Sequence, residues 1–345
     1  MKAIFYLLLL LLAGNTVLQA QNLITLQSGD NATFYNNLDT ALFYAKNGDD
    51  IYLPGGYIKA NATTLKIDKA VNIIGVGYNP YTNPATENTI IQSTTIEIMP
   101  NVNGGSISGI YGSTLRIQDA VSNFTVSRCS FMMMYIGSTL NIQITETIVH
   151  DIRGSNDPNG TSPQNVSISN SIIGSRGGAM PMASANNWNE LTCKNTIIMG
   201  DVTHHPLIYS IQNSLFENCI FLEFQGCRQM IGNSCSFRNC LYSGNCAIMQ
   251  NSIDVNCIFG QDPNSMFVDP QDFVFNMKND FRLQENSQGK NAGTDGTDIG
   301  IYGGRFPWKD GGLPVNPHIE SKFVNGTTDT NGNLNVKIKV AAQEK

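Results

Sequence analysis

Basic, acidic and aromatic side chains follow short apolar segments in the middle of this sequence. The candidate residues are Tyr135, His150, Asp151, Arg153, Arg176, His204, His205 and Arg228. Arginine can pair with an anionic group, histidine can accept a proton, and an aromatic ring can stack on a flat ligand. Polar residues here can equally serve to solvate loops. We predict that these eight residues lie in loops after equivalent strands, that the fold brings the loops to one face, and that this face is a binding site.

The adjacent pair His204–His205 raises the question of a metal ion. Neighbouring residues of a strand point to opposite faces, and no third ligand follows at a helpful spacing. Because zinc sites use three or more protein ligands, we predict no metal and no cofactor.

A six-residue motif organises the region that holds these residues. Between Phe124 and Phe259 it occurs seven times: an apolar residue, any residue, Asn or a polar substitute, then Cys, Ser or Thr, then two mostly apolar residues. The last copy is irregular, because Asp254 stands where an apolar residue is due. The fourth residues of the seven copies are Cys129, Thr147, Ser171, Thr196, Cys219, Cys240 and Cys257. Irregular spacing of a fixed unit indicates stacked repeats whose insertions loop out from one face. The alternating β-branched residues favour strands, and stacking buries a continuous core.

The third residue of the motif predicts a corner between strands. It is Asn170, Asn195, Asn218, Asn239 and Asn256 in five copies, whereas Arg128 and Glu146 replace it in the first two. Asparagine tolerates the left-handed backbone that a sharp bend requires. Coils stack at about 4.8 Å, so we expect these asparagines to bond from coil to coil as a ladder that is incomplete at its first two rungs.

The repeat, its corner residue and the segments at both ends resemble the right-handed parallel β-helix of the pectate-lyase-like superfamily, over residues 37–305. The resemblance implies an all-β solenoid whose substrate groove runs along one sheet between long loops. The superfamily includes lyases, hydrolases, adhesins and proteins without known activity. In a lyase, Arg153 or Arg176 would neutralise a uronate carboxylate and a His or another Arg would be the base, while Tyr135 and Trp188 could stack on sugars. The hydrolase motifs Asn-Thr-Asp, Gly-His-Gly and Arg-Ile-Lys are missing, as is an acidic cluster like the calcium site of pectate lyases.

Both ends of the solenoid have candidate caps. Asn37–Gly48 carries Leu38, Ala41, Leu42 and Ala45 on one helical face and predicts a capping helix. After a closing segment rich in Gly and Asp, residues 306–345 predict a linker and a small appendage of two strands, Ile319–Val324 and Asn333–Ala341. We therefore divide the chain into 1–20, 21–305 and 306–345.

Composition and the N-terminus indicate an exported protein. Lys2, the apolar run Ile4–Leu12 and Leu18-Gln-Ala20 predict a signal peptide over residues 1–20. No later segment is apolar enough to cross a bilayer, so we expect a secreted, periplasmic or surface-associated protein. Charged residues are only 14% and the net charge is −6, which argues against nucleic acid as a partner.

Seven of the eight cysteines divide into two groups, and Cys235 has no assigned place. Cys129, Cys219, Cys240 and Cys257 share a repeat position with Ser and Thr, and we predict buried free thiols there; Cys193, at an apolar position, also belongs to the core. Cys227 and Cys246 occupy corresponding loops and are the pair that we would test for a disulfide.

The function predicted from these features is binding of a polysaccharide or cell-surface glycan, an acidic one, along the loop-lined face. A polysaccharide lyase or glycoside hydrolase is the first alternative. A structural or adhesive surface protein without a small ligand is the second.

Overall fold

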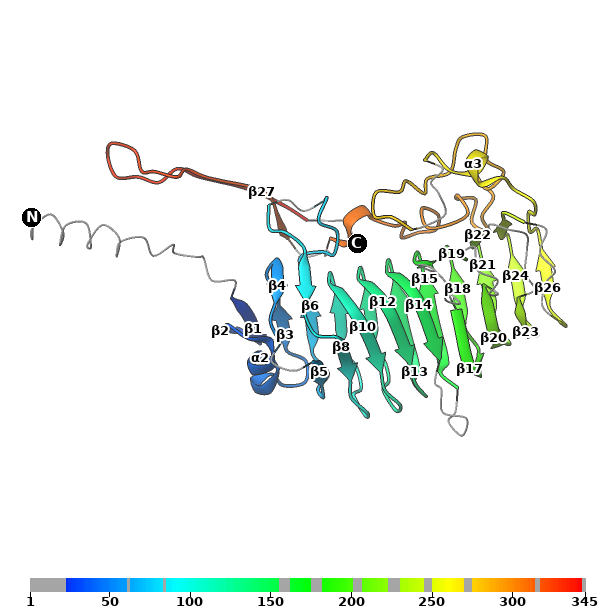
Figure 1. Cartoon of the computed structure of the whole chain (residues 1–345), viewed down its shortest axis with the longest axis horizontal. Coiled ribbons are helices and arrows are strands. Elements are labelled where there is room, and N and C mark those ends of the chain that lie inside the picture. The colour runs from blue at the N-terminus through cyan, green and yellow to red at the C-terminus, as the bar shows by residue number, and fades with distance from the viewer. Residues whose placement is uncertain are drawn as a thin grey trace, which may run out of the picture.

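The computed structural model describes residues 23–60, 63–82, 85–154, 162–174, 182–200, 207–222, 230–244, 250–269, 275–313 and 317–342. The chain forms a right-handed parallel β-helix, as predicted (Figure 1). Two long sheets make its walls, and strands from successive coils pair in parallel register.

Sheet A is defined by twelve strands, most of them three residues long. Its order is β2 (Asn31–Tyr35), β1 (Ile24–Ser28), β3 (Asp50–Tyr52), β6 (Asn72–Ile74), β9 (Ser106–Ser108), β11 (Thr125–Ser127), β13 (Leu140–Thr145), β15 (Gln164–Ser169), β18 (Thr192–Lys194), β21 (Leu215–Glu217), β24 (Ser236–Arg238) and β26 (Ile253–Val255).

Sheet B is defined by fourteen strands and bends around the rest of each coil. Its main path is β25 (Leu241–Tyr242), β22 (Ile220–Leu222), β19 (Ile197–Met199), β16 (Ile172–Gly174), β14 (Ile148–Gly154), β12 (Ser130–Ile136), β10 (Tyr111–Ile117), β7 (Thr89–Ile91) and β4 (Gly56–Ile58). The strands β5 (Thr64–Ile67), β8 (Thr95–Ile98), β17 (Met182–Asn189), β20 (Ile208–Gln212) and β23 (Ile231–Asn233) branch from it.

Each copy of the motif is the corner where sheet A passes into sheet B. In the fifth copy, Phe216 belongs to β21, Asn218 makes the turn, and Ile220 opens β22. All seven corner residues, Arg128 and Glu146 included, have left-handed φ between 44° and 56°. The predicted left-handed corner is therefore confirmed.

A second apolar core explains why the motif ends in two apolar residues. Consecutive residues of a strand face opposite sides, so in Ile172–Ile173, Ile197–Ile198 and Ile220–Phe221 the second residue enters the solenoid core and the first points outward. The outward row Ile148, Ile172, Ile197, Ile220 and Leu241 is nevertheless buried. It packs against residues of the closing segment, which we define as residues 262–313.

The closing segment runs back along the outside of the solenoid from the last coils toward the first (Figure 1). It begins with the short helix α3 (Pro263–Met266) and reaches the 3-10 turn η1 (Asp310–Gly312). Phe281, Leu283, Ile299, Ile301 and Trp308 supply its side of the second core.

Three motif asparagines, Asn170, Asn218 and Asn239, bond to the closing segment, and the described residues show no bond from one motif asparagine to another, which corrects the predicted ladder. Asn170 Nδ2 donates to the carbonyls of Ile301 and Gly303 at 2.9 and 3.0 Å, and Asn239 Nδ2 donates to Ala292 O at 2.7 Å. The closing segment covers the outer side of these corners, so its backbone supplies hydrogen-bond acceptors for these amides that the repeat alone does not predict.

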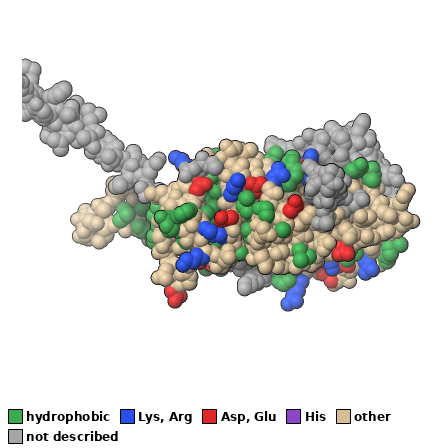
Figure 2. All heavy atoms as spheres, turned by 90° about the horizontal axis from the view of Figure 1, so that it is seen from below, with side chains coloured by type: hydrophobic (Ala, Val, Ile, Leu, Met, Phe, Trp, Pro, Cys, Tyr) green, Lys and Arg blue, Asp and Glu red, His purple; other side chains and the backbone are tan. Residues whose placement is uncertain are grey.

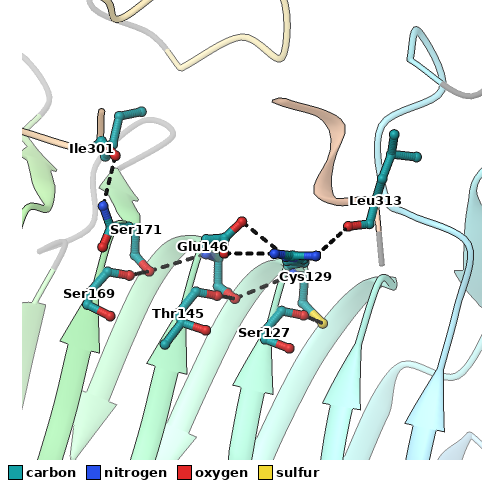
Figure 3. Close-up of polar contacts among 11 residues, drawn as sticks. Ser127, Cys129, Thr145, Glu146, Ser169, Ser171, Ile301 and Leu313 are labelled. Carbon is teal, nitrogen blue, oxygen red and sulfur yellow. Dashed lines mark hydrogen bonds and ion pairs between the residues drawn. The ribbon is translucent and has the colours of Figure 1, made fainter. Parts of the chain in front are cut away.

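Arg128 and Glu146 use the same corner position to form an ion pair. Arg128 Nε lies 3.0 Å from Glu146 Oε2, and Arg128 Nη1 donates to Leu313 O at 3.0 Å (Figure 3). Arg128 and Glu146, which replace asparagine in the first two copies, thus also attach the end of the closing segment to the solenoid.

The coil-to-coil ladder exists at a different corner, where each coil enters sheet A. Asn123 donates to Asn103 at 2.7 Å, Asn141 to Asn123 at 2.8 Å, and Asn165 to Asn141 at 2.6 Å. Later rungs join Asn213 to Asn189 and Asn251 to Asn233. The sequence does support an asparagine ladder, but our assignment of its residues was wrong.

The N-terminal cap is confirmed. Helix α2 (Leu38–Tyr44) begins at Asn37, whose side chain accepts hydrogen bonds from the backbone of Asp39 and Thr40. Leu38, Ala41 and Leu42 are buried. Strands β1 and β2 pair antiparallel at the first end of sheet A, where β2 is the outermost strand.

The cysteine predictions are largely confirmed for the described residues. Cys129, Cys193, Cys219 and Cys240 are buried and free as predicted, but Cys257 is only half-buried. Its neighbour β26 is the edge strand of sheet A, so no further coil covers it. Cys235, for which we made no prediction, is also buried and free. Cys227, Cys246 and the predicted signal peptide lie outside the described residues.

The C-terminal strands form an antiparallel hairpin of β27 (His318–Val324) and β28 (Val336–Ala341). Phe323, Ile338 and Val340 are exposed on it. Trp308, Gly311 and Gly312, within the predicted linker, are buried against the solenoid. The division of the chain at residue 305 stays a prediction.

Candidate functional site

The outer face of sheet B carries one row of polar side chains across five coils. We define the charged row as Lys66, Glu97, Arg116, Tyr135 and Arg153, which are direct register partners on β5, β8, β10, β12 and β14. The preceding residue of each strand is buried in the core: Leu65, Ile96, Leu115, Met134 and Ile152. Strand alternation therefore turns the charged row outward.

Arg116, Tyr135 and Arg153 form the centre of the row. The Arg116 guanidinium carbon lies 4.4 Å from the centroid of the Tyr135 ring, a cation–π contact. Arg153 is the register partner of Tyr135 on the opposite side, about 4.8 Å away along the solenoid axis. The result is a ring flanked by two arginines.

Asp151 holds Arg153 in place. The Arg153 Nη2–Asp151 Oδ2 distance is 2.6 Å, and Arg153 Nε lies 3.1 and 3.0 Å from the two carboxylate oxygens. Asp151 is 3% exposed, whereas the Arg153 side chain is 37% exposed. Hydrogen bonds to Asp151 raise the pKa of Arg153 against the opposing effect of burial. A guanidinium has five N–H donors, so it can hold Asp151 and still face a ligand.

His150 does not join the row. Val149 and Ile152 both enter the core, so β14 bends between them and His150 lies on the other side of that bend from Arg153. His150 Nδ1 is 3.1 Å from Gly174 O, and its ring packs edge-on against Phe275 at 5.7 Å.

Our placement of these residues in loops was wrong. Tyr135 lies in β12, and His150, Asp151 and Arg153 lie in β14, because the strands that leave the motif continue around a bend. Trp188, expected to stack on sugars, is instead buried in the core. Arg176, His204, His205 and Arg228 fall outside the described residues, so their place on this face stays a prediction.

The sequence analysis missed Lys66, Glu97 and Arg116. Their signal is a pattern that recurs in three early coils: Thr64-Leu-Lys-Ile67, Thr95-Ile-Glu-Ile98 and Thr114-Leu-Arg-Ile117. The same register positions hold Met133-Met-Tyr-Ile136 and Asp151-Ile-Arg-Gly154 in the next two coils. Alignment of these five segments would have placed Tyr135 and Arg153 side by side.

The charged row is mixed in charge rather than uniformly basic, because Glu97 lies between Lys66 and Arg116. Figure 2 shows basic and acidic side chains interspersed on the face that is seen from below. Among the described residues, no group of three or more His, Cys, Asp or Glu side chains could hold a metal ion. The side chains of the charged row can form ion pairs, hydrogen bonds and stacking contacts.

Comparison with known proteins adds a likeness of fold. No family model matches this chain, and no curated protein matches it. The solved structure of pectate lyase Pel9A superposes with a TM-score of 0.45 at 11% sequence identity, over 76% of this chain and 90% of that chain. We base the fold on the strand pairing above and argue function from the side chains of this chain.

None of the helices within the described residues is long and apolar enough to span a membrane.

Proposed function

We propose that this chain is an exported β-helix protein that binds an acidic glycan along the charged row of sheet B. Arg116, Tyr135 and Arg153 carry the proposal, because they set a sugar-stacking ring between two guanidinium groups. Uronate sugars combine an apolar ring face with a carboxylate, and arginine pairs with carboxylates through parallel hydrogen bonds.

The dimensions of the row suit a chain of sugars. Strand pairing continues the row beyond Arg153 to Ala183 and Tyr209. Five coils from Arg116 to Tyr209 extend for roughly 19 Å at about 4.8 Å per coil, a length that accommodates several sugar units. A polymer, rather than a single sugar, makes use of such a row.

We place the protein outside the cytoplasm: secreted, periplasmic or attached to the cell surface. The predicted signal peptide over residues 1–20 supports this location. Residues 21–305 would then be the binding solenoid, and residues 306–345 a linker and appendage.

Binding of polygalacturonate, measured by titration calorimetry, tests the proposal. Arg116→Gln removes a charge from the row without leaving a buried carboxylate unpaired, and we expect it to weaken binding about tenfold. Arg153 is tested with the double variant Asp151→Asn/Arg153→Gln, because Arg153→Ala alone would leave the buried Asp151 carboxylate without its ion-pair partner.

Arg238→Gln provides the matched control, since Arg238 is exposed on sheet A. It should bind like the wild type, and wild-type binding should weaken as salt rises. Absence of polygalacturonate binding, or equal losses in Arg116→Gln and Arg238→Gln, would refute the proposal. Ultraviolet absorbance from unsaturated uronates would instead establish the lyase alternative, and new reducing ends the hydrolase.

A further inference from the structure

A separate cavity of about 410 Å³ lies where the closing segment meets the first coils. Residues 78–82 of the loop after β6 form one wall, residues 275–282 and 302–311 form the others, and Ile148 and Ile172 form the floor. This volume falls within the range of about 300–1,000 Å³ of small-molecule sites. The charged row is on the other side of the bend in β14.

Aromatic rings dominate the lining. They are Tyr78, Tyr81, Phe275, Phe281, Tyr302 and Trp308. Tyr78, Phe281 and Trp308 are buried, while Tyr81 is 63% exposed. The buried rings make the base apolar, and the exposed Tyr81 ring at the edge offers a surface on which a flat ligand can stack.

The charges around the cavity cancel one another. Two basic side chains, Lys278 and Arg282, and two acidic ones, Asp280 and Asp310, line it. Arg282 pairs with Asp280 at 3.1 Å and with Asp310 at 2.8 Å, and the Tyr302 hydroxyl donates to Asp310 at 2.8 Å. No net charge is left to attract an ion, which favours a neutral ligand.

Cations of the protein already occupy two of the ring faces. Lys278 lies 4.7 Å from the Tyr81 centroid, and Arg282 lies 4.7 Å from the Tyr302 centroid. An aromatic cage for a quaternary ammonium group would need those faces open. The arrangement therefore disfavours a cationic ligand.

Amide groups supply hydrogen bonds to the cavity. Asn79, Asn276 and Asn279 line it. Asn276 is exposed, so its side-chain amide can donate to a hydroxyl oxygen of a ligand. Asn79 is buried and Asn279 half-buried, and both form part of the wall.

Close contacts fix the edge of the cavity. Gly311 and Gly312 have φ of 90° and 61°. A Cβ on Gly312 would lie 2.1 Å from the Tyr78 ring, and one on Gly311 would lie 2.1 Å from Thr82 Oγ1. Only glycine allows this approach, so the closing segment and the loop after β6 meet in one geometry.

We propose that this cavity is a second binding site, which takes a neutral pyranose sugar. The face of the exposed Tyr81 ring opposite Lys278 stacks on the apolar face of the sugar, and the exposed Asn276 amide bonds to a hydroxyl group of the sugar. This inference is independent of acidic-glycan binding at the charged row.

Tryptophan fluorescence provides a direct test, because the chain has two Trp residues and only Trp308 lines the cavity. In a Trp188→Phe background, we would titrate the methyl glycosides of glucose, galactose, mannose and N-acetylglucosamine. At least one should change the Trp308 emission saturably in the millimolar range, as expected for a single sugar. Galacturonate and choline should not.

Tyr81→Ala should weaken that binding about tenfold or more. Tyr57→Ala is the matched control, because Tyr57 is 66% exposed and does not line the cavity. Arg116→Gln should leave the fluorescence titration unchanged, which separates this site from the charged row. Failure of all four glycosides, binding of choline or galacturonate instead, or equal effects of the two tyrosine variants would overturn the proposal.

Discussion

Asn218 and Thr294 hold each other through two hydrogen bonds across 76 residues of sequence. The Thr294 backbone N–H donates to Asn218 Oδ1 at 2.9 Å, and Asn218 Nδ2 donates to Thr294 Oγ1 at 3.2 Å. Asn218 also has the left-handed φ of 55° that turns its coil. One residue thus shapes the solenoid and attaches the closing segment to it.

Replacement of Asn218 should separate these two roles. Asn218→Gly keeps the backbone conformation and loses the two bonds, so we expect a loss of about 1–2 kcal/mol in the free energy of unfolding. Asn218→Val loses the same two bonds and also forces a β-branched residue into the left-handed conformation, so we expect a total loss of about 2–4 kcal/mol in the free energy of unfolding. Urea denaturation measures both; a valine variant as stable as the wild type would contradict the corner assignment.

Much of the solenoid follows from local residue patterns. The corner residues, the capping helix, and strands such as Thr64–Ile67 and Thr95–Ile98 agree with the structure because each depends on neighbours in the sequence. The course of the closing segment could not be predicted in this way, because its sequence has no periodicity. The sequence indicates the closing segment only indirectly. Pairs such as Ile197–Ile198 place apolar side chains on both faces of a strand, so the outer face requires a covering layer.

The candidate site was only partly predictable for a related reason. Tyr135 and Arg153 were chosen for their chemistry, but their contact depends on strands that continue past a bend, and the sequence analysis ended those strands too early. Arg116 was overlooked because it precedes the first copy of the motif. Register, rather than residue type, decides which side chains meet on a stacked sheet.

Glycines of the closing segment offer a test of its docking. Gly300 has φ of 97°, and a Cβ there would lie 2.6 Å from Ile220 Cδ1. Gly300→Ala should therefore loosen the segment, lower the unfolding free energy by about 2–3 kcal/mol and make residues 262–313 sensitive to limited proteolysis.

Gly296→Ala is the control for backbone strain alone. Gly296 also has a positive φ, 79°, but its Cβ would meet nothing within 4 Å. We expect a loss of about 1 kcal/mol from the left-handed conformation and no new cleavage. If the two variants were cleaved equally, steric docking against Ile220 would not be what holds the segment.

The buried thiols should make the fold sensitive to alkaline pH. Burial raises the pKa of Cys129 from 9.0 to about 12. A raised pKa means that the folded state favours the protonated thiol. The contribution of this thiol to the free energy of unfolding is therefore complete below pH 9 and is lost as pH rises from 9 toward 12. Urea midpoints should be nearly constant from pH 8 to pH 9 and should fall from pH 9 to pH 11.

Cys129→Ser should reduce that fall, because serine does not ionise in this range and Ser171 occupies the same corner position in another coil. Alkylation gives a second measure. The half-buried Cys257 should react before Cys129 in the folded protein, and both should react fully in urea. Equal rates for the two thiols in the folded state would count against the burial described here.

The ring of Tyr135 should contribute to acidic-glycan binding apart from its hydroxyl. It lies between Arg116 and Arg153 and contacts the Arg116 guanidinium at 4.4 Å. Tyr135→Phe keeps the ring and should bind polygalacturonate within about twofold of the wild type, whereas Tyr135→Ala should bind about 5- to 30-fold more weakly. Calorimetric titration at two salt concentrations measures these affinities. Loss of the Tyr135 ring should lower the affinity at both concentrations, while Arg116→Gln should mainly reduce the salt dependence of binding. If the alanine variant bound as well as the phenylalanine variant, the ring would have no part in recognition, and the charged row would act through its cations alone.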